Sequence, residues 1–254
     1  MATVRRVLAS NGGPFTGPGT NTWVVGDDPV KIVIDPGPDA DGHFEAIQRA
    51  LGGAALGVVL VTHSHQDHLE LAERLAQAQQ SRVARYPELA DGDVVRAGPL
   101  NLTALHTPGH APDHLAFWIE EDRVLFSGDL ILGRGSSMVT YPEGDVAAYL
   151  RSLERVAELG PRMIFPGHWD PVTEAAAKVS EYHSHRLERE RQVVEELGRG
   201  PGTAEELTRR IYEPEVGGSE PLLRAAEMTL RAHLRKLVDE GRAREVGGRF
   251  ELIG

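Results

Sequence analysis

Three histidines and an aspartate fall within six consecutive residues, in the segment His-Ser-His-Gln-Asp-His at positions 63–68. The residues before this segment, 58–61, form a short apolar run rich in valine, which is typical of a buried strand. Apolar residues then recur at helical spacing between positions 69 and 76, which predicts a helix from about Leu69. The cluster therefore lies at the carboxyl end of a buried strand, where open α/β sheets usually hold their functional sites.

The composition of the cluster indicates its chemistry. Neutral imidazole nitrogens and carboxylate oxygens are the ligands that zinc and similar divalent ions prefer. A polar turn that is rich in histidine by chance is the alternative, and it suits a single histidine better than an H-x-H-x-D-H pattern. We expect a metal site after this strand.

Length and composition limit what else the chain contains. The 254 residues suffice for one large domain, or for one medium domain with a small one. No apolar run reaches membrane-spanning length, and residues 1–13 contain no apolar segment after their two arginines, so no secretory signal is expected. The chain has no cysteine, which excludes disulfides and thiolate ligands. These features favour a cytoplasmic location, and the net charge of −11 argues against loose, non-specific nucleic-acid binding while allowing a local basic groove.

The first part of the chain alternates predicted strands and helices. Residues 21–37 are expected to form two strands joined by a Gly-Asp-Asp-Pro turn. Further strands are expected near residues 100–105, 115–119, 124–127 and 163–166, and helices near residues 43–51 and 144–159. This mixture indicates layers of helix and sheet, an α/β (α+β) class of fold.

The last part of the chain has a different pattern. A long helix is expected from about residue 174 to Gly198, followed by a Gly-Arg-Gly-Pro-Gly breaker. A capping box at residues 203–206 opens another helix, a third helix covers about 221–240, and a hairpin turns at Gly247-Gly248. We therefore predict a catalytic domain over residues 1–198, including the linking helix, and a small winged-helix-like domain over residues 199–254.

Three more candidate ligands lie downstream of the cluster. His110 occurs in Thr-Pro-Gly-His, Asp129 in Ser-Gly-Asp and His168 in Pro-Gly-His, each beside a predicted strand and after a glycine that lets the backbone turn sharply. Convergence of these loops at one sheet edge would create two metal positions. We assign His63, His65 and His110 to one metal, Asp67, His68 and His168 to the other, and Asp129 to a bridge between them.

These motifs, in this order, resemble those of the metallo-β-lactamase superfamily of dinuclear hydrolases. All seven ligand positions are matched, and the pattern spans residues 20–170. The resemblance implies a four-layer αβ/βα sandwich, two divalent metal ions, with zinc favoured over manganese or iron, and a role for Asp67 in accepting a proton from a hydroxide-forming water and orienting it. Two departures lie close to the second metal position: Leu69-Glu70 replaces a small pair, and Trp169-Asp170 follows His168 where glycine is common. A bulky Trp169 would narrow the cleft and favour a small or threaded substrate.

The remaining histidines and one aspartate have alternative roles. Asp35, in Asp-Pro-Gly, is a candidate hydrogen-bond partner of a ligand histidine, or else a plain turn residue. His114 is expected to support a ligand, to approach substrate, or simply to start a strand. His43 and His106 are expected to be structural or surface residues, and His233 a buried core histidine on the apolar face of its helix.

The first hypothesis for the substrate is RNA. Residues 13–26, 127–137 and 182–192, together with the predicted winged helix, resemble the mitochondrial lactamase-like endoribonuclease and its bacterial relatives. That resemblance implies cleavage of phosphodiesters in single-stranded RNA. Basic residues of the winged helix are candidates for phosphate contacts, or else form a solvated face: Arg231, Arg235, Lys236, Arg242, Arg244 and Arg249.

The second hypothesis is a thioester or ester hydrolase that acts on a small acyl conjugate. Hydroxyacylglutathione hydrolases share the seven ligands, and some polyketide-releasing thioesterases resemble the domain arrangement. The glutathione enzymes usually carry an all-helical C-terminal region, which the predicted wing argues against. Under either hypothesis Tyr182, His185 and Arg186 are candidates to contact a substrate anion at the site mouth, or else form an exposed helix face.

Two further functions fit the sequence less well. Zinc β-lactamases resemble this chain in fold, but they are typically exported and carry a cysteine ligand, so β-lactam hydrolysis is expected to be a side activity at most. A non-enzymatic, winged-helix nucleic-acid-binding protein would leave seven ligand positions without a purpose. The expected partners are therefore RNA or a small acyl thioester, with no membrane.

Overall fold

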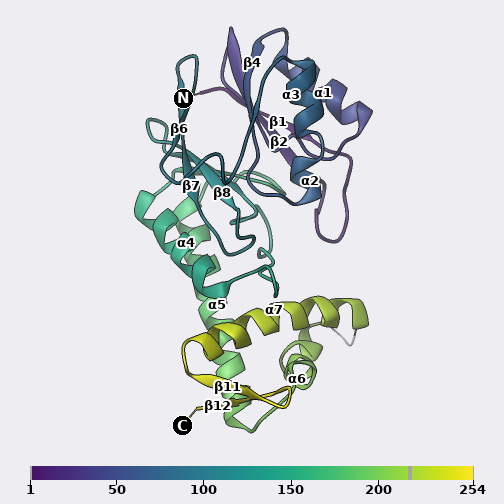
Figure 1. Ribbon diagram of the computed structural model, residues 1–254, viewed down its shortest axis with the longest axis vertical. Helices are drawn as coiled ribbons and strands as arrows, with labels where there is room; N and C mark the ends of the chain where they lie inside the picture. The colour runs from purple at the N-terminus through teal and green to yellow at the C-terminus, as the bar shows by residue number, and fades with distance from the viewer. Residues whose placement is uncertain (1, 217–218, 254) are drawn as a thin grey trace.

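The computed structural model describes residues 2–216 and 219–253, so the outermost residues of the two predicted domains lie outside the described part. Two five-stranded sheets face each other in the upper part of the molecule (Figure 1). The first sheet has the spatial order β1-β2-β3-β4-β5 and is antiparallel up to β3 and parallel after it. Its strands are β1 (Val4–Leu8), β2 (Asn21–Val25), β3 (Val30–Ile34), β4 (Ala55–Leu60) and β5 (Val83–Ala84).

The second sheet has the order β10-β9-β8-β7-β6 and is antiparallel except for the parallel pair of β10 with β9. Its strands are β6 (Val94–Ala97), β7 (Leu100–His106), β8 (Leu115–Ile119), β9 (Val124–Gly128) and β10 (Met163–Pro166). Strands β8 and β9 are buried along their whole length, because both faces of this sheet are covered.

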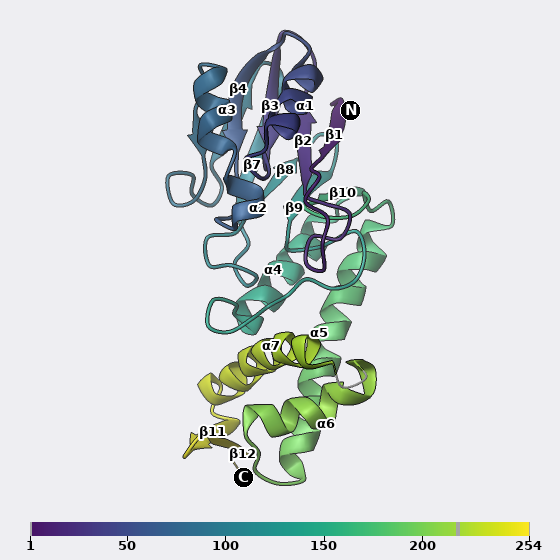
Figure 2. The ribbon, with the colours of Figure 1, turned by 90° about the vertical axis from the view of Figure 1, so that its right-hand side faces the viewer.

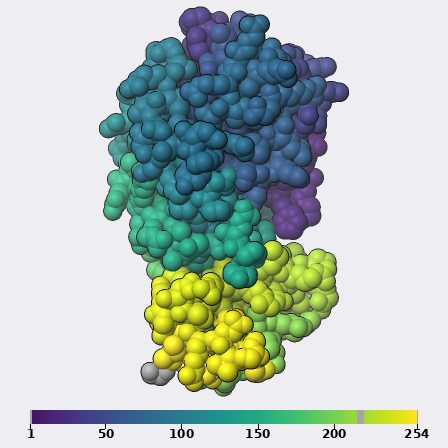
Figure 3. Space-filling view, in the orientation of Figure 1, coloured from purple at the N-terminus to yellow at the C-terminus, as the bar shows by residue number. Residues whose placement is uncertain are grey.

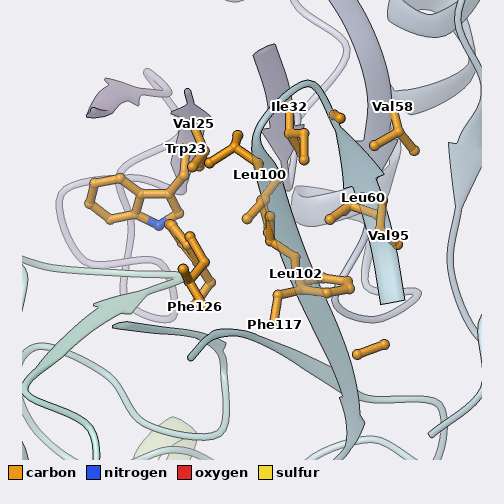
Figure 4. Close-up of a cluster of buried hydrophobic side chains, with 14 of the residues drawn as sticks. Trp23, Val25, Ile32, Val58, Leu60, Val95, Leu100, Leu102, Phe117 and Phe126 are labelled. Carbon is orange, nitrogen blue, oxygen red and sulfur yellow. The ribbon is translucent and has the colours of Figure 1, made fainter. Parts of the chain in front are cut away.

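The inner faces of the two sheets form one hydrophobic core (Figure 4). Trp23 and Ile32 from the first sheet pack with Leu102, Phe117 and Phe126 from the second. The Trp23 indole nitrogen also donates a hydrogen bond of 3.0 Å to the carbonyl of Pro166, so its one polar atom is satisfied inside the core.

Helices cover the two outer faces, on opposite sides of the sheet pair (Figure 2). The first sheet is covered by α1 (Asp41–Leu51), α2 (Gln66–Leu69) and α3 (Ala72–Ala78), and the second sheet by α4 (Val146–Leu159) and α5 (Ala175–Gly198). Each long helix turns an apolar stripe to its sheet; Ile47 and Leu51 of α1 and Leu153 of α4 are all buried. The architecture is the four-layer αβ/βα sandwich that the sequence predicts.

The C-terminal part forms a separate core at the lower end of the molecule (Figure 3). It contains α6 (Ala204–Val216), α7 (Glu220–Asp239) and a hairpin of β11 (Ala243–Val246) and β12 (Arg249–Leu252). The predicted capping box forms: the Glu206 amide donates to Thr203 Oγ1 at 3.2 Å, and the Thr203 amide donates to Glu206 Oε2 at 3.0 Å. Val193 and Leu197, near the end of α5, join this core, so α5 links the two parts.

One element differs from its prediction in a way that affects the site. The single helix expected from about Leu69 is two helices: the short α2 begins at Gln66, so Asp67 and His68 lie in its first turn, and α3 begins at Ala72. A carboxylate in the first turn of a helix is favoured by the exposed N–H groups there. The strands β1, β5 and β6 were not predicted: β1 and β6 include exposed positions and lack the continuous buried run of β8 and β9, and β5 has only two residues. No helix of residues 2–216 and 219–253 is long and apolar enough to cross a membrane.

Candidate metal centre

The candidate site lies where the ends of the two sheets meet. The Leu115 amide donates to the Thr62 carbonyl at 2.7 Å, and the Asn21 amide donates to the Gly167 carbonyl at 2.7 Å. These bonds connect the sheets at the end where the loops after β4, β7, β9 and β10 converge. All seven ligand candidates lie on these loops or in the adjoining α2.

The first group of candidate ligands is a triad of histidines. His63 Nε2 lies 2.9 Å from His65 Nδ1, and His110 Nε2 lies 3.1 Å from the same His65 atom. His110 is 45 positions from His65 in the chain, yet each of the three rings directs one nitrogen to a common point. The triad can hold one metal ion.

The second group is made of Asp67, His68 and His168. Asp67 Oδ2 lies 3.5 Å from His68 Nε2 and 3.3 Å from His168 Nε2. Asp129 lies between the two groups: its Oδ2 is 3.5 Å from His168 Nε2 and 3.8 Å from His110 Nε2, and its Oδ1 is 3.5 Å from His68 Nε2. The structure thus brings all seven candidates together at one place, where His63, His68 and Asp129 form a further group that could hold an ion.

Two atoms of this cluster fit the presence of a cation. His68 Nε2 and Asp129 Oδ1 are fully buried, and neither has a hydrogen-bond partner among the described residues. A buried polar atom without a partner costs about 1–3 kcal/mol. A divalent cation that accepts both atoms as ligands would remove this cost, and a His/Asp donor set without sulfur suits zinc, manganese or iron.

Most ligand rings are oriented by a hydrogen bond on their other nitrogen. His110 Nδ1 donates to the Met138 carbonyl at 2.6 Å, and His168 Nδ1 donates to the Gly19 carbonyl at 3.2 Å. Both bonds occupy Nδ1, so that Nε2 is directed into the cluster as the nitrogen that can bind a metal ion. His65 has the opposite orientation, with its Nε2 3.4 Å from a carboxylate oxygen of Glu143.

Asp35 performs the same task for His68. Its Oδ2 lies 2.8 Å from His68 Nδ1 and also accepts a hydrogen bond from Thr62 Oγ1 at 2.8 Å, while its Oδ1 accepts one from the Thr62 amide at 2.8 Å. Asp35 has a φ of 51°, a left-handed backbone that is uncommon for a residue with a side chain. The contacts at both oxygens hold it there, so the structure places Asp35 in the supporting role expected for it.

The glycines before the downstream ligands have different tasks. Gly109, before His110, has a φ of 140°, which favours glycine, and a Cβ there would fall 2.4 Å from the backbone of Tyr149. Gly167, before His168, has no such φ; a Cβ there would lie 2.4 Å from Asp129 Oδ1 and 2.7 Å from His68 Cε1. The sequence prediction of a sharp turn therefore holds for Gly109, whereas Gly167 is required for close approach to the cluster.

Burial and the neighbouring charges together shift the pKa values of the ligand candidates. Burial disfavours the charged form of His168, but Asp129 and Asp67 outweigh it and raise the pKa of His168 to about 9. Burial likewise opposes ionisation of Asp67, yet its contact with His168 lowers the pKa of Asp67 to about 2. Burial and the neighbouring His68 lower the pKa of His63 well below its usual value. Protons thus occupy positions that a cation would take, and metal binding would release them.

His114 and Trp169 both adjoin the cluster. His114 is fully buried; its Nε2 accepts the Asp129 amide at 3.2 Å and its Nδ1 lies 2.9 Å from Thr107 Oγ1, so it supports a ligand. Trp169 lines the cavity over the cluster, and its ring packs so close to Gly17 that a Cβ there would lie 2.5 Å from the indole.

Tyr182, His185 and Arg186 do not line the cavity. Tyr182 and Arg186 are buried, which contradicts the exposed helix face, and they contact the back of the loop after Asp129. The Leu132 amide donates to the Tyr182 hydroxyl at 3.0 Å, and Arg186 donates to the Ser137 carbonyl. His185 Nδ1 lies 3.5 Å from Ser136 Oγ. Helix spacing alone could not reveal that this loop covers the face of α5.

The cavity above the cluster has a volume of about 660 Å³. Its floor is formed by ligand candidates, and its walls come from the loops 14–17 and 132–140 and from Trp169. Thr20 and Arg134 belong to these surroundings, although neither was singled out from the sequence. Thr20 Oγ1 donates to Asp67 Oδ2 at 3.1 Å, and Arg134 lines the cavity wall. Both lie in segments quoted above for their family resemblance, which was the available signal.

Comparison with known families matches most of the chain. The model of the metallo-beta-lactamase superfamily matches residues 15–91 and 84–168. The model of the beta-lactamase associated winged helix domain matches residues 203–250, which confirms the predicted winged helix.

Two relatives and one solved structure are similar to most of the chain. The chain is 32% identical to a beta-lactamase-like protein 2 homolog of Caenorhabditis elegans, over 82% of this chain and 76% of the relative. It is 35% identical to an atrochrysone carboxyl ACP thioesterase of Aspergillus chevalieri, over 82% and 73%. A beta-lactamase domain protein from Burkholderia ambifaria has the same fold, with a TM-score of 0.84 at 24% identity over 98% of this chain and 91% of that one.

Proposed function

The chain belongs to the metallo-beta-lactamase superfamily, and we propose that within this superfamily it hydrolyses acyl thioesters with two divalent metal ions. The similarity to a thioesterase over 82% of the chain carries the proposal, because a match of this extent includes the loops of the ligand candidates. The cavity of about 660 Å³ directly over the ligand cluster has room for an acyl group of moderate size.

We assign the ligand candidates to two ions. His63, His65 and His110 would hold one ion, Asp67, His68 and His168 the other, and Asp129 would contact both. Two bound cations would lower the pKa of a shared water towards neutrality and polarise the thioester carbonyl. We favour zinc, because zinc prefers tetrahedral coordination and is commonly bound by groups of three histidines.

Asp67 is the residue that we assign to the attacking water. Its Oδ2 is held by the Thr20 hydroxyl, and Asn11 Nδ2 in turn donates to Thr20 Oγ1 at 2.9 Å. The second oxygen, Asp67 Oδ1, has no hydrogen-bond partner among the described side chains, so we assign it to orient a water and accept its proton. The water oxygen would then bond to the carbonyl carbon, the carbon–sulfur bond would break, and the thiolate would leave.

RNA cleavage, the first hypothesis from the sequence, receives less support. The reported relatives are named as a thioesterase and as a beta-lactamase-like protein. Each basic residue proposed for phosphate contacts pairs with a carboxylate of the same chain: Arg231 with Glu227, Arg235 with Asp239, Lys236 and Arg242 with Glu190, Arg244 with Glu251, and Arg249 with Glu206. Phosphate binding would have to displace these partners, which favours the acyl-thioester hypothesis.

A paired assay on metal-analysed protein tests the proposal. The substrates are acyl-glutathione and acyl-N-acetylcysteamine thioesters in one arm and a fluorescent single-stranded RNA in the other. Asp67→Ala is the inactive reference, and Asp170→Ala is the matched control, because the Asp170 carboxylate is exposed and pairs with Arg6 outside the cluster. Thioester turnover that needs metal and Asp67 supports the proposal; RNA cleavage without thioester turnover overturns it.

A further inference from the structure

The loop that follows Asp129 is fixed to the candidate metal centre at several points. The Gly133 amide donates to the His168 carbonyl at 3.1 Å, and Ser137 Oγ donates to the Asp129 carbonyl at 2.5 Å. Between these two bonds lies Arg134, an exposed residue that lines the cavity. The backbone of Arg134 is thus held one residue away from a contact with a ligand candidate.

The guanidinium of Arg134 is held by an aromatic ring instead of a carboxylate. Its central carbon lies 5.4 Å from the centre of the Trp169 ring, a cation–π arrangement. Within residues 2–216 and 219–253, Arg134 makes no ion pair, whereas nearby Arg6 pairs with Asp170 at 2.7 Å. An indole face orients a cation without neutralising it, so the charge of Arg134 remains available to a ligand.

The rest of the cavity wall is largely apolar. Phe15, which is 70% exposed, and Leu132, Met138 and Trp169 surround the opening. Arg134 is the one lysine or arginine among the described residues that line the cavity. A wall of this kind suits an apolar chain that carries one negative group at a fixed distance from the reacting carbonyl.

We propose that Arg134 is a specificity-determining residue that binds an anionic group of the thioester substrate. The group is a carboxylate or a phosphate, since a guanidinium binds both in a bidentate manner. It comes from the acyl half, as a second carboxylate, or from the thiol half, as the phosphate of a phosphopantetheine arm. This inference rests on the proposed thioesterase activity and names the class of substrate for the same site.

Four thioesters with one acyl length separate the two sources. A neutral acyl group and a dicarboxylic acyl group with one free carboxylate are each presented on pantetheine and on 4′-phosphopantetheine. In Arg134→Met we expect kcat/KM to fall by about 10- to 100-fold, mainly through KM, for every substrate that carries the recognised anion, and by less than about twofold for the neutral one. Arg134→Lys is expected to lose less activity than Arg134→Met, because lysine keeps the positive charge but lacks the planar guanidinium that binds an anion through two parallel hydrogen bonds.

Arg6→Met is the matched control, because Arg6 lies near Trp169 but is already paired with Asp170. Equal losses on neutral and anionic substrates in Arg134→Met would reduce Arg134 to a structural role and overturn the inference. Wild-type protein that shows no preference for either anion would also overturn it.

A binding measurement keeps this inference separate from the proposed activity. Thioether analogues of the same four compounds, which cannot be hydrolysed, are titrated by calorimetry into wild-type protein and into Arg134→Met. Tighter binding of an anionic analogue that depends on Arg134 supports the anion site, even if no thioester turns over. Turnover of the neutral thioester with binding that ignores the anion leaves the thioesterase proposal intact and overturns the role of Arg134.

Discussion

Among the described residues, two buried histidines have ring nitrogens without a hydrogen-bond partner, and their surroundings are opposite. His68, in the candidate metal centre, faces the carboxylates of Asp35 and Asp129, which outweigh burial and raise its pKa well above the usual value. His233, on α7, faces cations, so burial and its neighbours lower its pKa to about 3. A buried imidazole among carboxylates marks a place for a cation, whereas one among cations stays neutral and acts as packing.

The same contrast extends to the charges around each histidine. In the candidate metal centre, the carboxylates face imidazoles: Asp129 lies 3.5 Å from His68 Nε2 and from His168 Nε2. In the winged helix, cations and carboxylates pair with each other along the surface, as Arg235 does with Asp239 at 2.7 Å. The candidate metal centre and the winged helix therefore differ in how their carboxylates are satisfied: by imidazoles at the centre, and by arginine and lysine in the winged helix.

The largest expected effect comes from removing the bridging carboxylate. Asp129→Ala takes away the one group placed between both ligand groups, so we expect bound metal to fall below two equivalents and kcat/KM for thioesters to fall by roughly 10³-fold or more. Metal analysis by mass spectrometry and steady-state kinetics measure the two effects. Asp170→Ala, with its exposed carboxylate, is the control. Full metal content in Asp129→Ala would show that Asp129 is not needed to hold the ions and would contradict the contrast between the candidate metal centre and the winged helix.

A smaller loss is expected at Arg186, which acts on the centre through the loop it holds. Arg186 donates to the Ser137 carbonyl and to Ser136 Oγ at 2.9 Å, and Ser137 in turn binds the Asp129 carbonyl. We expect Arg186→Met to weaken metal affinity by about 10- to 100-fold, the range found for outer partners of metal ligands.

Competition with a chelator of known affinity measures this effect. Arg191→Met on the exposed face of the same helix is the control, since Arg191 pairs only with Glu188 and Glu195. Equal metal affinity in Arg186→Met and wild type would show that the loop is fixed without Arg186.

The third effect concerns pH and sharpens the comparison of the two histidines. His233 faces Arg186, Arg189 and His185 from α5 and Lys236 from its own helix. Its pKa of about 3 in the folded protein is lower than the ordinary 6.5, so the unfolded chain binds this proton first as pH falls. Its contribution to stability is complete above pH 6.5 and is lost on acidification towards pH 3, at up to about 1.4 kcal/mol per pH unit.

His233→Leu should remove this acid sensitivity. The variant keeps a similar volume and has no nitrogen to satisfy, so we expect equal or higher stability than wild type at pH 7 and a widening advantage down to pH 4.5. Urea unfolding at several pH values measures it on protein stripped of metal, so that metal release does not contribute. Parallel stability curves for the two proteins would show that His233 is hydrated or paired in solution.

Much of the fold follows directly from the sequence pattern. Strands such as β8 and β10 and helices such as α4 and α5 were predicted within two residues, because buried runs and amphipathic stripes determine them locally. The seven ligand candidates were also found, since histidine and aspartate beside glycine at strand ends are rare enough to recognise. Their convergence needed the family resemblance, because the sequence does not give the distance between loops.

The sequence did not predict the roles of residues that act through contacts with another loop. Thr20 contacts Asp67 across 47 positions, and nothing local distinguishes it from other threonines. Arg186 was expected at the site mouth or on an exposed face, yet it is buried because the loop after Asp129 covers it. Arg134 depends in the same way on Trp169, 35 positions further along the chain.

The smallest expected effect lies in the winged helix. It tests whether the charged side chains there bind a ligand or only pair with each other at the surface. Arg235 and Asp239 form an exposed i,i+4 pair on α7, and such pairs contribute about 0.3–0.5 kcal/mol. We expect Arg235→Ala to change the free energy of unfolding by less than about 0.5 kcal/mol and to leave thioester turnover unchanged, because this cation is compensated within its own helix. Chemical unfolding and kinetics at low and high salt measure both quantities, with Asp239→Asn as the variant that instead frees Arg235. If RNA affinity fell in Arg235→Ala and rose in Asp239→Asn, the wing would be a nucleic-acid surface and the contrast between the two regions would fail.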